Sequence, residues 1–363
     1  MYTRERTRAV KIGNLRIGGN APVSVQSMTT TDTRNVSDTI AQIKRMEIEG
    51  CELVRVAVPD LKSCNSLPSI KKEINIPLVA DIHYDFKLAL KSIEFGVDGI
   101  RINPGNIKNA EKIKSIIKSA KEKNLPIRFG INSGSLDKDI LKKYNKINPQ
   151  ALMESAKNII TILEEVNYHN VIFSIKSIDV IDTIEANYIF SSKFNYPLHL
   201  GITEAGPPFP GIIKSSIGIG LLLYQGIGNT IRVSLTGDPI EEIKVGYEIL
   251  KALHLRQRGL NLISCPTCAR CKVDLNKIVK KVEKQICNIN KPLTIAVMGC
   301  MVNGPGEARE ADIGIAYHKK TGVLFKKGKI LGKFSDKIII KRLVEEIKDI
   351  SSNNVNNINQ VIS

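Results

Sequence analysis

The stretch PLVADIHYDFKLALKSIEFGVDGIRIN, residues 77–103, decides the fold class of this chain. Short apolar runs predict one strand over Pro77–Ile82 and another over Gly99–Asn103. Between them, the amphipathic segment Asp85–Phe95 begins with an aspartate, a residue that commonly caps helices. A strand, a helix and a strand in this order are typical of two parallel strands joined by a crossover helix.

The same alternation extends over the first two-thirds of the chain. Further helices are predicted, for example over Val36–Glu49, Ala110–Lys121, Pro149–Glu165 and Pro239–Leu255. Because eight strands that alternate with helices close into a ring, the expected fold class is α/β with a (β/α)8 TIM barrel. The eight predicted strands are Val23–Met28, Leu53–Val58, Pro77–Ile82, Gly99–Asn103, Ile127–Asn132, Val171–Lys176, Leu198–Thr203 and Thr230–Leu235.

Two short apolar runs, Val10–Ile12 and Leu15–Ile17, precede the first strand. They flank Gly13-Asn14, a pair of residues that favours the tight turn of a β-hairpin. We expect this hairpin to plug the bottom of the barrel.

The sequence pattern changes after Leu262, where Ser264-Cys265-Pro266-Thr267-Cys268 begins. The following residues predict a small α+β domain. We therefore expect a substrate-binding barrel over residues 1–258, a second domain over 259–350 and a poorly ordered polar tail over 351–363. The predicted elements of the second domain are the helix Asp274–Cys287, the strands Leu293–Met298 and Asp312–Ala316, the hairpin Val323–Lys326 with Lys329–Leu331, and the helix Ser335–Ile350.

Composition limits the classes of protein. Hydrophobic residues make up 42% of the chain and charged residues 25%, as in globular proteins with a packed core. No apolar run approaches the roughly 20 residues of a membrane span, and the first residues lack the apolar core of a signal peptide. We therefore expect a cytoplasmic protein without membrane association.

The net charge of +17 is compatible with an anionic substrate, an acidic partner, nucleic acid, or lysine-rich solvated helices. The absence of Trp argues against stacking on single-stranded nucleic acid.

The ends of the predicted strands carry an unusual set of polar residues. In a barrel of this kind the active site is built at the carboxyl ends of the strands. Four arginines and one lysine there predict a multiply anionic substrate, because arginine forks bind phosphate oxygens with paired hydrogen bonds. Strand by strand, the ends carry Gln26, Arg55, Asp81 with His83, Arg101 with Asn103, Arg128 with Asn132, Lys176, Glu204, and Arg232 with Ser234.

The two acidic residues at these ends have two possible roles. Asp81 and Glu204 either orient the arginines or transfer protons in the reaction. His83 is either a structural histidine or part of the substrate site. A pterin-binding barrel transferase would also use Asp, Asn, Lys and Arg at its strand ends, and remains an alternative on these residues.

The cysteines predict a metal site in the second domain. In a cytosolic chain, their clustering in the last third favours metal over disulfides. Cys265 and Cys268 have the C-x-x-C spacing of zinc and iron–sulfur ligands, and Cys271 and Cys300 are further thiols for such a site. A zinc-containing nucleic-acid-binding protein is therefore a second alternative. The seven cysteines are Cys51, Cys64, Cys265, Cys268, Cys271, Cys287 and Cys300.

One long segment favours the iron–sulfur interpretation. The run Gly299-Cys300-Met301-Val302-Asn303-Gly304-Pro305-Gly306-Glu307, together with Ser264–Cys268, closely resembles the bacterial 4-hydroxy-3-methylbut-2-enyl diphosphate synthase family of the non-mevalonate isoprenoid pathway. The resemblance covers nearly the whole chain. It includes Ser24-Val25-Gln26-Ser27-Met28-Thr29, Arg101-Ile102-Asn103-Pro104-Gly105-Asn106-Ile107 and Leu200-Gly201-Ile202-Thr203-Glu204-Ala205-Gly206.

The resemblance implies a cofactor, a substrate and partners. A 4Fe-4S cluster would be held by Cys265, Cys268, Cys300 and Glu307, with Cys271 as a bystander. The substrate would be 2-C-methyl-D-erythritol 2,4-cyclodiphosphate, reduced with electrons from flavodoxin or ferredoxin. An exchangeable carboxylate ligand would let one iron take a substrate oxygen. A homodimer is also implied, with the cluster domain of one chain over the barrel mouth of the other.

Under this hypothesis each candidate residue has a role. Glu204 is the candidate for proton delivery, and Asp81 and Glu307 complete the expected catalytic set. The expected substrate-binding residues are Arg55, His83, Arg101, Asn103, Arg128, Asn132, Lys176, Arg232, Ser234 and Asn303.

Overall fold

The chain forms two compact units, Met1–Arg256 and Gln257–Ser363. The structure is a computed structural model that describes residues 3–107, 109–271, 273–286, 289, 291–301, 306 and 308–358. In this part of the chain no helix is long and apolar enough to cross a lipid bilayer.

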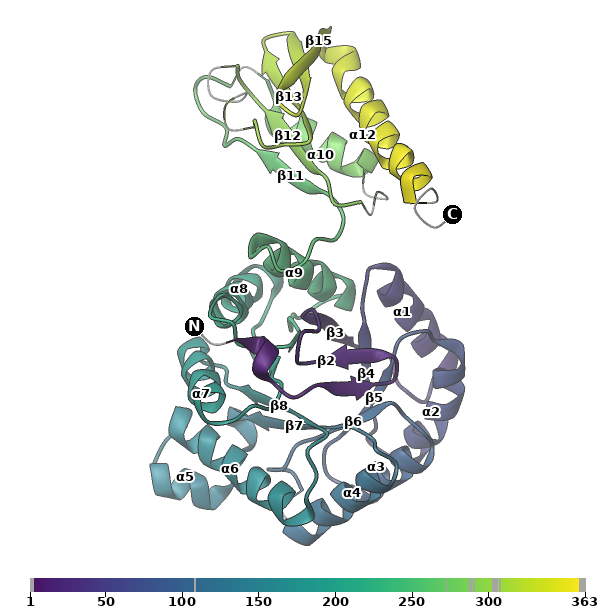
Figure 1. Cartoon of the computed structure of the whole chain (residues 1–363), viewed down its shortest axis with the longest axis vertical. Helices are drawn as coiled ribbons and strands as arrows, with labels where there is room; N and C mark the ends of the chain where they lie inside the picture. The colour runs from purple at the N-terminus through teal and green to yellow at the C-terminus, as the bar shows by residue number, and fades with distance from the viewer. Residues whose placement is uncertain are drawn as a thin grey trace. The chain divides into compact units, whose positions relative to one another are not determined.

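The first unit is the predicted (β/α)8 barrel, which is thereby confirmed (Figure 1). All neighbouring strands run parallel, in the order β8-β7-β6-β5-β4-β3-β10-β9. A bridge between Phe173 and Leu198 lies where β8 meets β9 and the ring closes. The strands are β3 (Ser24–Met28), β4 (Leu53–Ala57), β5 (Leu78–Ile82), β6 (Gly99–Ile102), β7 (Ile127–Asn132), β8 (Val171–Lys176), β9 (His199–Leu200) and β10 (Thr230–Ile231).

The helices surround the strands as an outer layer (Figure 1). Most of them begin at an Asp or Asn whose side chain accepts a hydrogen bond from the first helical turn, for example Asn35, Asp85 and Asp179. The helices of this unit are η1 (Arg4–Arg6), α1 (Val36–Ile48), α2 (Leu61–Glu73), α3 (Phe86–Glu94), α4 (Ala110–Glu122), η2 (Ser133–Ser135), α5 (Lys138–Tyr144), α6 (Pro149–Val166), α7 (Val180–Lys193), α8 (Pro208–Tyr224) and α9 (Pro239–Ala252).

Strands β9 and β10 are much shorter than the predicted Leu198–Thr203 and Thr230–Leu235. After β9 the backbone turns sharply, with positive φ angles at Glu204 (+51°) and Gly206 (+105°). The amide of Thr236 donates to the carbonyl oxygen of Gly206 at 3.0 Å and links the loops that follow the two strands. The residues expected to end these strands therefore lie in loops at the barrel mouth.

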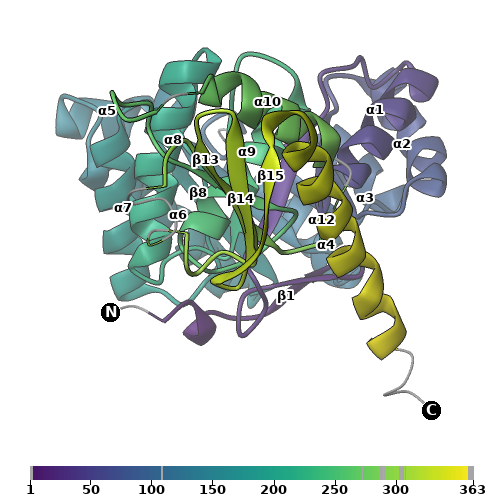
Figure 2. The same ribbon diagram turned by 90° about the horizontal axis from the view of Figure 1, so that it is seen from above.

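The N-terminal hairpin plugs the bottom of the barrel, as predicted. It pairs β1 (Val10–Ile12) with β2 (Leu15–Ile17), and Figure 2 shows it crossing one end of the barrel. Its buried residues, Ile12 and Ile17 among them, pack against Leu53 and Val79 in the first halves of β4 and β5. The hairpin thus seals the end of the barrel opposite the mouth with apolar side chains.

The second unit is the expected small α+β domain. Its sheet has the order β11-β12-β13-β14-β15, with the first three strands parallel and the rest antiparallel. The sequence had not predicted β11, and α12 extends beyond the predicted end at Ile350. Cys287 and residues 359–363 lie outside the described residues. The elements are β11 (Asn261–Ser264), α10 (Leu275–Ile286), β12 (Thr294–Met298), β13 (Ile313–His318), β14 (Thr321–Lys326), β15 (Lys329–Ser335) and α12 (Asp336–Ile358).

The plug makes a testable contribution to stability. Ile17 is fully buried, so Ile17→Ala should lower the free energy of unfolding by about 2–5 kcal/mol through lost burial and a cavity. Urea unfolding followed by circular dichroism measures this change. Leu61→Ala, at a side chain that is 56% exposed, is the control and should change stability by no more than about 0.5 kcal/mol. Equal effects of the two substitutions would show that the hairpin does not seal the barrel.

Candidate active site

The five basic residues expected at the mouth share the interior of the barrel. Arg101 and Arg128 are each 5% exposed and Lys176 is 9% exposed. Burial is the largest cause that lowers the pKa of Arg128 and of Lys176, and the surrounding arginines lower both pKa values further. The cations of this group therefore lie close enough to repel one another. The five are Arg55 on β4, Arg101 on β6, Arg128 on β7, Lys176 at the end of β8, and Arg232 just after β10.

Asp81 holds two of these arginines. Its carboxylate lies 3.4 Å from Arg55 Nε and 3.0 Å from Arg101 Nη1. Burial raises the pKa of Asp81, but Arg55 and Arg101 outweigh burial and hold it well below its usual range. His83 Nε2 lies 3.4 Å from the same carboxylate. Asp81 is therefore an ionised anchor for the arginines, the first of the two roles considered from the sequence.

Glu242, which the sequence had not singled out, anchors Arg232. This buried glutamate of α9 lies 3.2 Å from both Nε and Nη2 of Arg232. It also accepts hydrogen bonds from Ser27 Oγ at 2.8 Å and from the amide of Leu235 at 3.0 Å. The sequence offered one signal for its role: Glu242 lies beside Ile243 on the apolar face of the predicted helix, where an acidic residue needs a partner.

Arg128 and Lys176 have no such anchor, because no carboxylate in the described part of the chain pairs with either of them. Arg128 is the second residue of β7, so it lies deeper than the strand end where the sequence placed it. Its Nη1 donates to the side-chain oxygen of Gln26 on β3. Burial lowers the pKa of Arg128 and of Lys176 well below the usual values. When protonated, these two groups place positive charge inside the barrel that no described carboxylate compensates.

Glycines make room for two of the cations. A Cβ atom on Gly130 would lie 2.5 Å from Arg101 Nε, and one on Gly201 would collide with Lys176 Nζ. Real Cβ atoms do not approach other atoms this closely, so the missing side chains leave space for the charged groups.

A buried histidine is a further residue that sequence reasoning missed. His199 begins β9 and is 1% exposed, and its Nε2 has no hydrogen-bond partner among the described residues. Burial, followed by the charges of Arg128 and Lys176, lowers its pKa well below the usual value. His199 is therefore neutral beside the cations.

The expected polar residues occupy different depths. Asn103 is buried and donates from Nδ2 to Ser135 Oγ at 2.7 Å, whereas Asn132 and Ser234 are half-buried. His83 Nδ1 lies 3.1 Å from Asn106 Nδ2. Glu204 is exposed, and its left-handed backbone conformation is one that non-glycine residues adopt mainly where surrounding structure imposes it.

The second unit brings two of the expected cluster ligands to one edge of its sheet. Cys265 directly follows β11, and Cys300 lies two residues after β12, the parallel neighbour of β11. The amide of Gly299 donates to Cys265 Sγ at 3.2 Å. Backbone hydrogen bonding at Arg270 lowers the pKa of Cys268, which favours its thiolate.

The full ligand set is not assembled in the described residues. Within them no group of three or more His, Cys, Asp or Glu side chains is arranged to bind a metal ion. Glu307 and Asn303 lie outside the described residues. Cys271 Sγ lies against Gly299 and 3.2 Å from the carbonyl oxygen of Val273.

The remaining described cysteines have surroundings unlike those of metal ligands. Cys51 and Cys64 are buried in the barrel core. Burial raises the pKa of Cys51 to about 12, which disfavours the thiolate that a metal requires.

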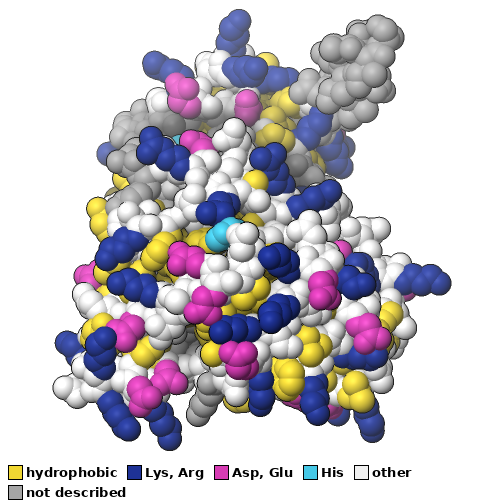
Figure 3. Space-filling view, turned by 60° about the horizontal axis from the view of Figure 1, so that its bottom comes forward, with side chains coloured by type: hydrophobic (Ala, Val, Ile, Leu, Met, Phe, Trp, Pro, Cys, Tyr) yellow, Lys and Arg dark blue, Asp and Glu magenta, His cyan; other side chains and the backbone are white. Residues whose placement is uncertain are grey.

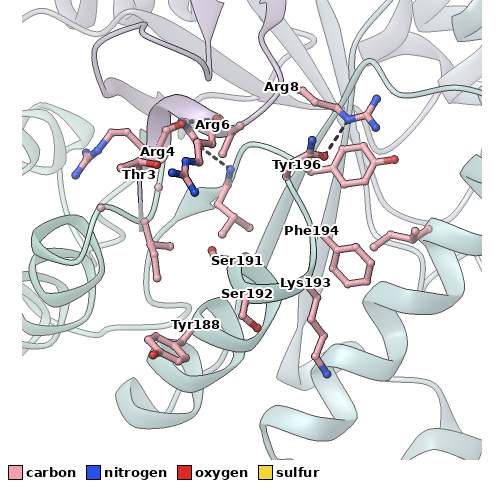
Figure 4. Close-up of a pocket in the computed structure, with 18 of the residues that line it drawn as sticks. Thr3, Arg4, Arg6, Arg8, Tyr188, Ser191, Ser192, Lys193, Phe194 and Tyr196 are labelled. Carbon is pink, nitrogen blue, oxygen red and sulfur yellow. Dashed lines mark hydrogen bonds between the residues drawn. The ribbon is translucent and has the colours of Figure 1, made fainter. Parts of the chain in front are cut away.

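A separate cavity of about 780 Å³ lies at the other end of the barrel (Figure 4). It is lined by the N-terminal segment with Arg4, Arg6 and Arg8, by the end of α7 with Lys193, and by residues that precede β8, β9 and β10. Its position at the amino ends of the strands separates it from the cation cluster.

The fold and the site define a class of protein: a (β/α)8 barrel with a cationic interior, joined to a cysteine-bearing α+β domain. Two family models match the chain, the GcpE TIM-barrel domain over residues 7–247 and the GcpE protein C-terminal domain over residues 261–349. The chain belongs to the GcpE family.

Curated relatives support the same assignment. The chain is 56% identical to a 4-hydroxy-3-methylbut-2-en-1-yl diphosphate synthase (flavodoxin) of Caldanaerobacter subterraneus subsp. tengcongensis, over 95% of this chain and 97% of the relative. It is also 56% identical to the enzyme of the same name from Clostridium tetani, over 96% and 99%. Among solved structures, a dihydropteroate synthase from Xanthomonas albilineans has a TM-score of 0.49 and 13% identity, over 68% of this chain and 98% of that chain. The resemblance stated from the motifs is confirmed.

The unanchored lysine allows a prediction about stability and binding. Lys176→Met should raise the melting temperature of the ligand-free protein, because it removes a buried charge without a paired carboxylate. It should weaken inorganic pyrophosphate binding about 10- to 100-fold, the effect of about 1.5–3 kcal/mol for one charged hydrogen bond. Scanning calorimetry and titration calorimetry measure the two changes.

The stability gain should depend on pH. Because burial lowers the pKa of Lys176, its charge destabilises the folded state fully below that folded pKa. The cost then declines as the pH rises toward the unfolded value near about 10.4. The melting temperatures of Lys176→Met and the unsubstituted protein should converge over that interval. A variant that is less stable at pH 7 and binds pyrophosphate normally would contradict the prediction.

Proposed function

We propose that this chain reduces 2-C-methyl-D-erythritol 2,4-cyclodiphosphate to 4-hydroxy-3-methylbut-2-enyl diphosphate. The cyclic diphosphate is opened at a carbon–oxygen bond and one hydroxyl leaves as water. Two electrons and two protons enter for each substrate, which balances the loss of one oxygen. The product is the diphosphate for which the relatives are named, and it serves as an isoprenoid precursor.

The observation that carries this proposal is the charge inside the barrel. Five cations face two carboxylates, Asp81 and Glu242, in the described interior, and the cations that lack a carboxylate are Arg128 and Lys176. A diphosphate supplies the missing negative charge and offers oxygens on several sides to the guanidinium groups.

The other barrel residues orient the substrate and supply protons. Arg55, Arg101 and Arg232 are held by their carboxylates, so they present fixed donors to the ligand. Asn103, Asn132 and Ser234 supply neutral hydrogen bonds, as would Asn303, and His83 is a further substrate-binding residue. Glu204, exposed in the loop after β9, is the proposed group for proton delivery.

We propose that the second domain holds a 4Fe-4S cluster through Cys265, Cys268, Cys300 and Glu307, with Cys271 as a bystander. The donor chemistry fits, because thiolates bind iron–sulfur clusters, the amide of Gly299 donates to the sulfur of Cys265, and backbone hydrogen bonding lowers the pKa of Cys268. When bound, the cluster would supply electrons one at a time and an iron that could accept an oxygen atom of the substrate as a ligand.

Reduced flavodoxin is the proposed electron donor, with ferredoxin as the alternative carrier. The relatives are named as flavodoxin-dependent synthases. An acidic carrier would suit this chain, which has a net charge of +17, with Lys and Arg spread over the face seen in Figure 3. The free thiols suit a reducing cytoplasm, where we place the reaction.

We further propose that the enzyme is a homodimer in which two chains share each site. Helices α7 and α8 expose a group of large apolar side chains, a feature that marks interaction surfaces. The barrel unit ends near its bottom, because Arg256 donates to the carbonyl oxygen of Val23, the residue before β3. This supports completion of each mouth by the cluster domain of a second copy. The exposed side chains are Ile181, Tyr188, Phe209, Ile212, Ile213, Ile217, Leu221 and Tyr224.

The cluster assignment predicts which thiols are needed. Cys265→Ser, Cys268→Ser and Cys300→Ser should each lose stable cluster binding, because a hydroxyl does not replace a thiolate on iron. Cys271→Ser is the matched control from the same segment and should keep the cluster. Iron and sulfide content and visible absorbance after anaerobic purification give the result. A full cluster in Cys300→Ser, or a colourless Cys271→Ser protein, would overturn the ligand set.

The shared site predicts complementation between two inactive variants. Arg128→Ala removes a cation from the barrel and Cys300→Ser removes a cluster ligand. When the two proteins are refolded together, some dimers should contain one intact barrel facing one intact cluster domain, and activity should partly return. Differently tagged subunits show by pull-down that mixed dimers have formed. Mixed dimers that remain inactive would refute the shared site.

A further inference from the structure

Gln26 occupies the place where a carboxylate would be expected. It lies in the middle of β3, is 1% exposed, and accepts a hydrogen bond from Arg128 Nη1 through its side-chain oxygen. Carboxylates play this part for the other three arginines, Asp81 for Arg55 and Arg101, and Glu242 for Arg232. Among the arginines described in this interior, Arg128 is thus held by a neutral side chain, whereas the others are held by carboxylates.

A carboxylate at position 26 would fit the same space, because glutamine and glutamate have nearly the same shape. It would pair with a guanidinium that is otherwise buried among like charges, since Arg55 and Arg101 both lower the pKa of Arg128 after burial. An unpaired buried charge costs far more than a paired one. The amide thus gives up stability that a carboxylate would supply.

The side of Arg128 that faces the N-terminal hairpin has no room for an anion that would neutralise its charge. The cavity between Gln26, Arg128 and the plug has a volume of about 10 Å³, and its other lining residues include Ile12, Ile17 and Leu53. That is roughly the space for one water molecule. Compensation of the Arg128 charge must therefore come from the mouth side.

The free atoms of Arg128 are suited to an anion. Its Nε and Nη2 are buried and have no hydrogen-bond partner among the described residues. These two atoms form one edge of the guanidinium, the edge that binds two phosphate oxygens side by side. With Nη1 held by Gln26, the group is fixed in orientation while its charge and this edge remain uncommitted.

We infer that Gln26 is a positioning residue that sets the affinity for the diphosphate: it orients Arg128 without neutralising it. The inference rests on the proposed function, because it names the diphosphate as the anion that completes this charge. A glutamate at the same position would orient Arg128 equally well but compete with the substrate for its charge.

The test compares Gln26→Glu with Gln26→Met in the cluster-loaded enzyme. Gln26→Glu should raise the melting temperature and weaken binding of the cyclic diphosphate and of inorganic pyrophosphate about 10- to 100-fold. The change should appear in KM, with kcat affected much less. Gln26→Met removes the hydrogen bond that orients Arg128 but adds no charge, so it should lower the melting temperature and weaken binding only about threefold, much less than Gln26→Glu.

Three outcomes would be decisive against the inference. Gln26→Glu could bind both anions as tightly as the unsubstituted enzyme, or could be less stable than it. Both variants could also lose affinity equally, which would indicate a merely structural role. If the unsubstituted enzyme binds pyrophosphate but not the cyclic diphosphate, the proposed function fails, while the pyrophosphate comparison still tests Gln26.

Discussion

Excess buried positive charge is the constraint on which the rest of this structure depends. Placing five cations in one barrel interior against two carboxylates is unfavourable, because buried charges repel in a medium of low dielectric constant. Burial first, and the neighbouring cations second, lower the pKa values of Arg128, Lys176 and His199. We propose that a bound diphosphate would relieve this repulsion, so that the free energy it costs the folded barrel would contribute to binding an anionic substrate.

The scaffold tolerates this charge because its other parts are strongly apolar and well capped. The barrel core is built from branched aliphatic residues and aromatic residues such as Phe129 and Phe173, and the hairpin closes the bottom with Ile12 and Ile17. Helix caps by Asp and Asn side chains satisfy amides that would otherwise lack partners. Rigid strands then hold each cation at a fixed depth, and Gly130 and Gly201 leave room for Arg101 and Lys176.

The same geometric rule organises both units. Parallel strands bring residues that follow them to a common edge, whatever their separation in the chain. In the barrel this rule gathers arginines from three strands and one loop into the interior that also holds Asp81 and Glu242. In the second unit it places Cys265 and Cys300 at neighbouring strand ends. The candidate site residues of each unit thus lie at or near the carboxyl ends of neighbouring strands.

The sequence by itself determined the barrel, the hairpin and the identity of the cations in the barrel, because these depend on local periodicity and on motifs such as Gly13-Asn14, but it did not indicate β11. Glu242 and His199 could not be found in this way, because neither lies in a motif and their roles depend on which side chains surround them. Only tertiary structure decided which charges are paired. Asp81 neutralises arginines from two strands, whereas Arg128, deeper in β7, meets the neutral amide of Gln26. The pairing of each arginine with a carboxylate depends on distances across the barrel, and these distances cannot be inferred from local sequence.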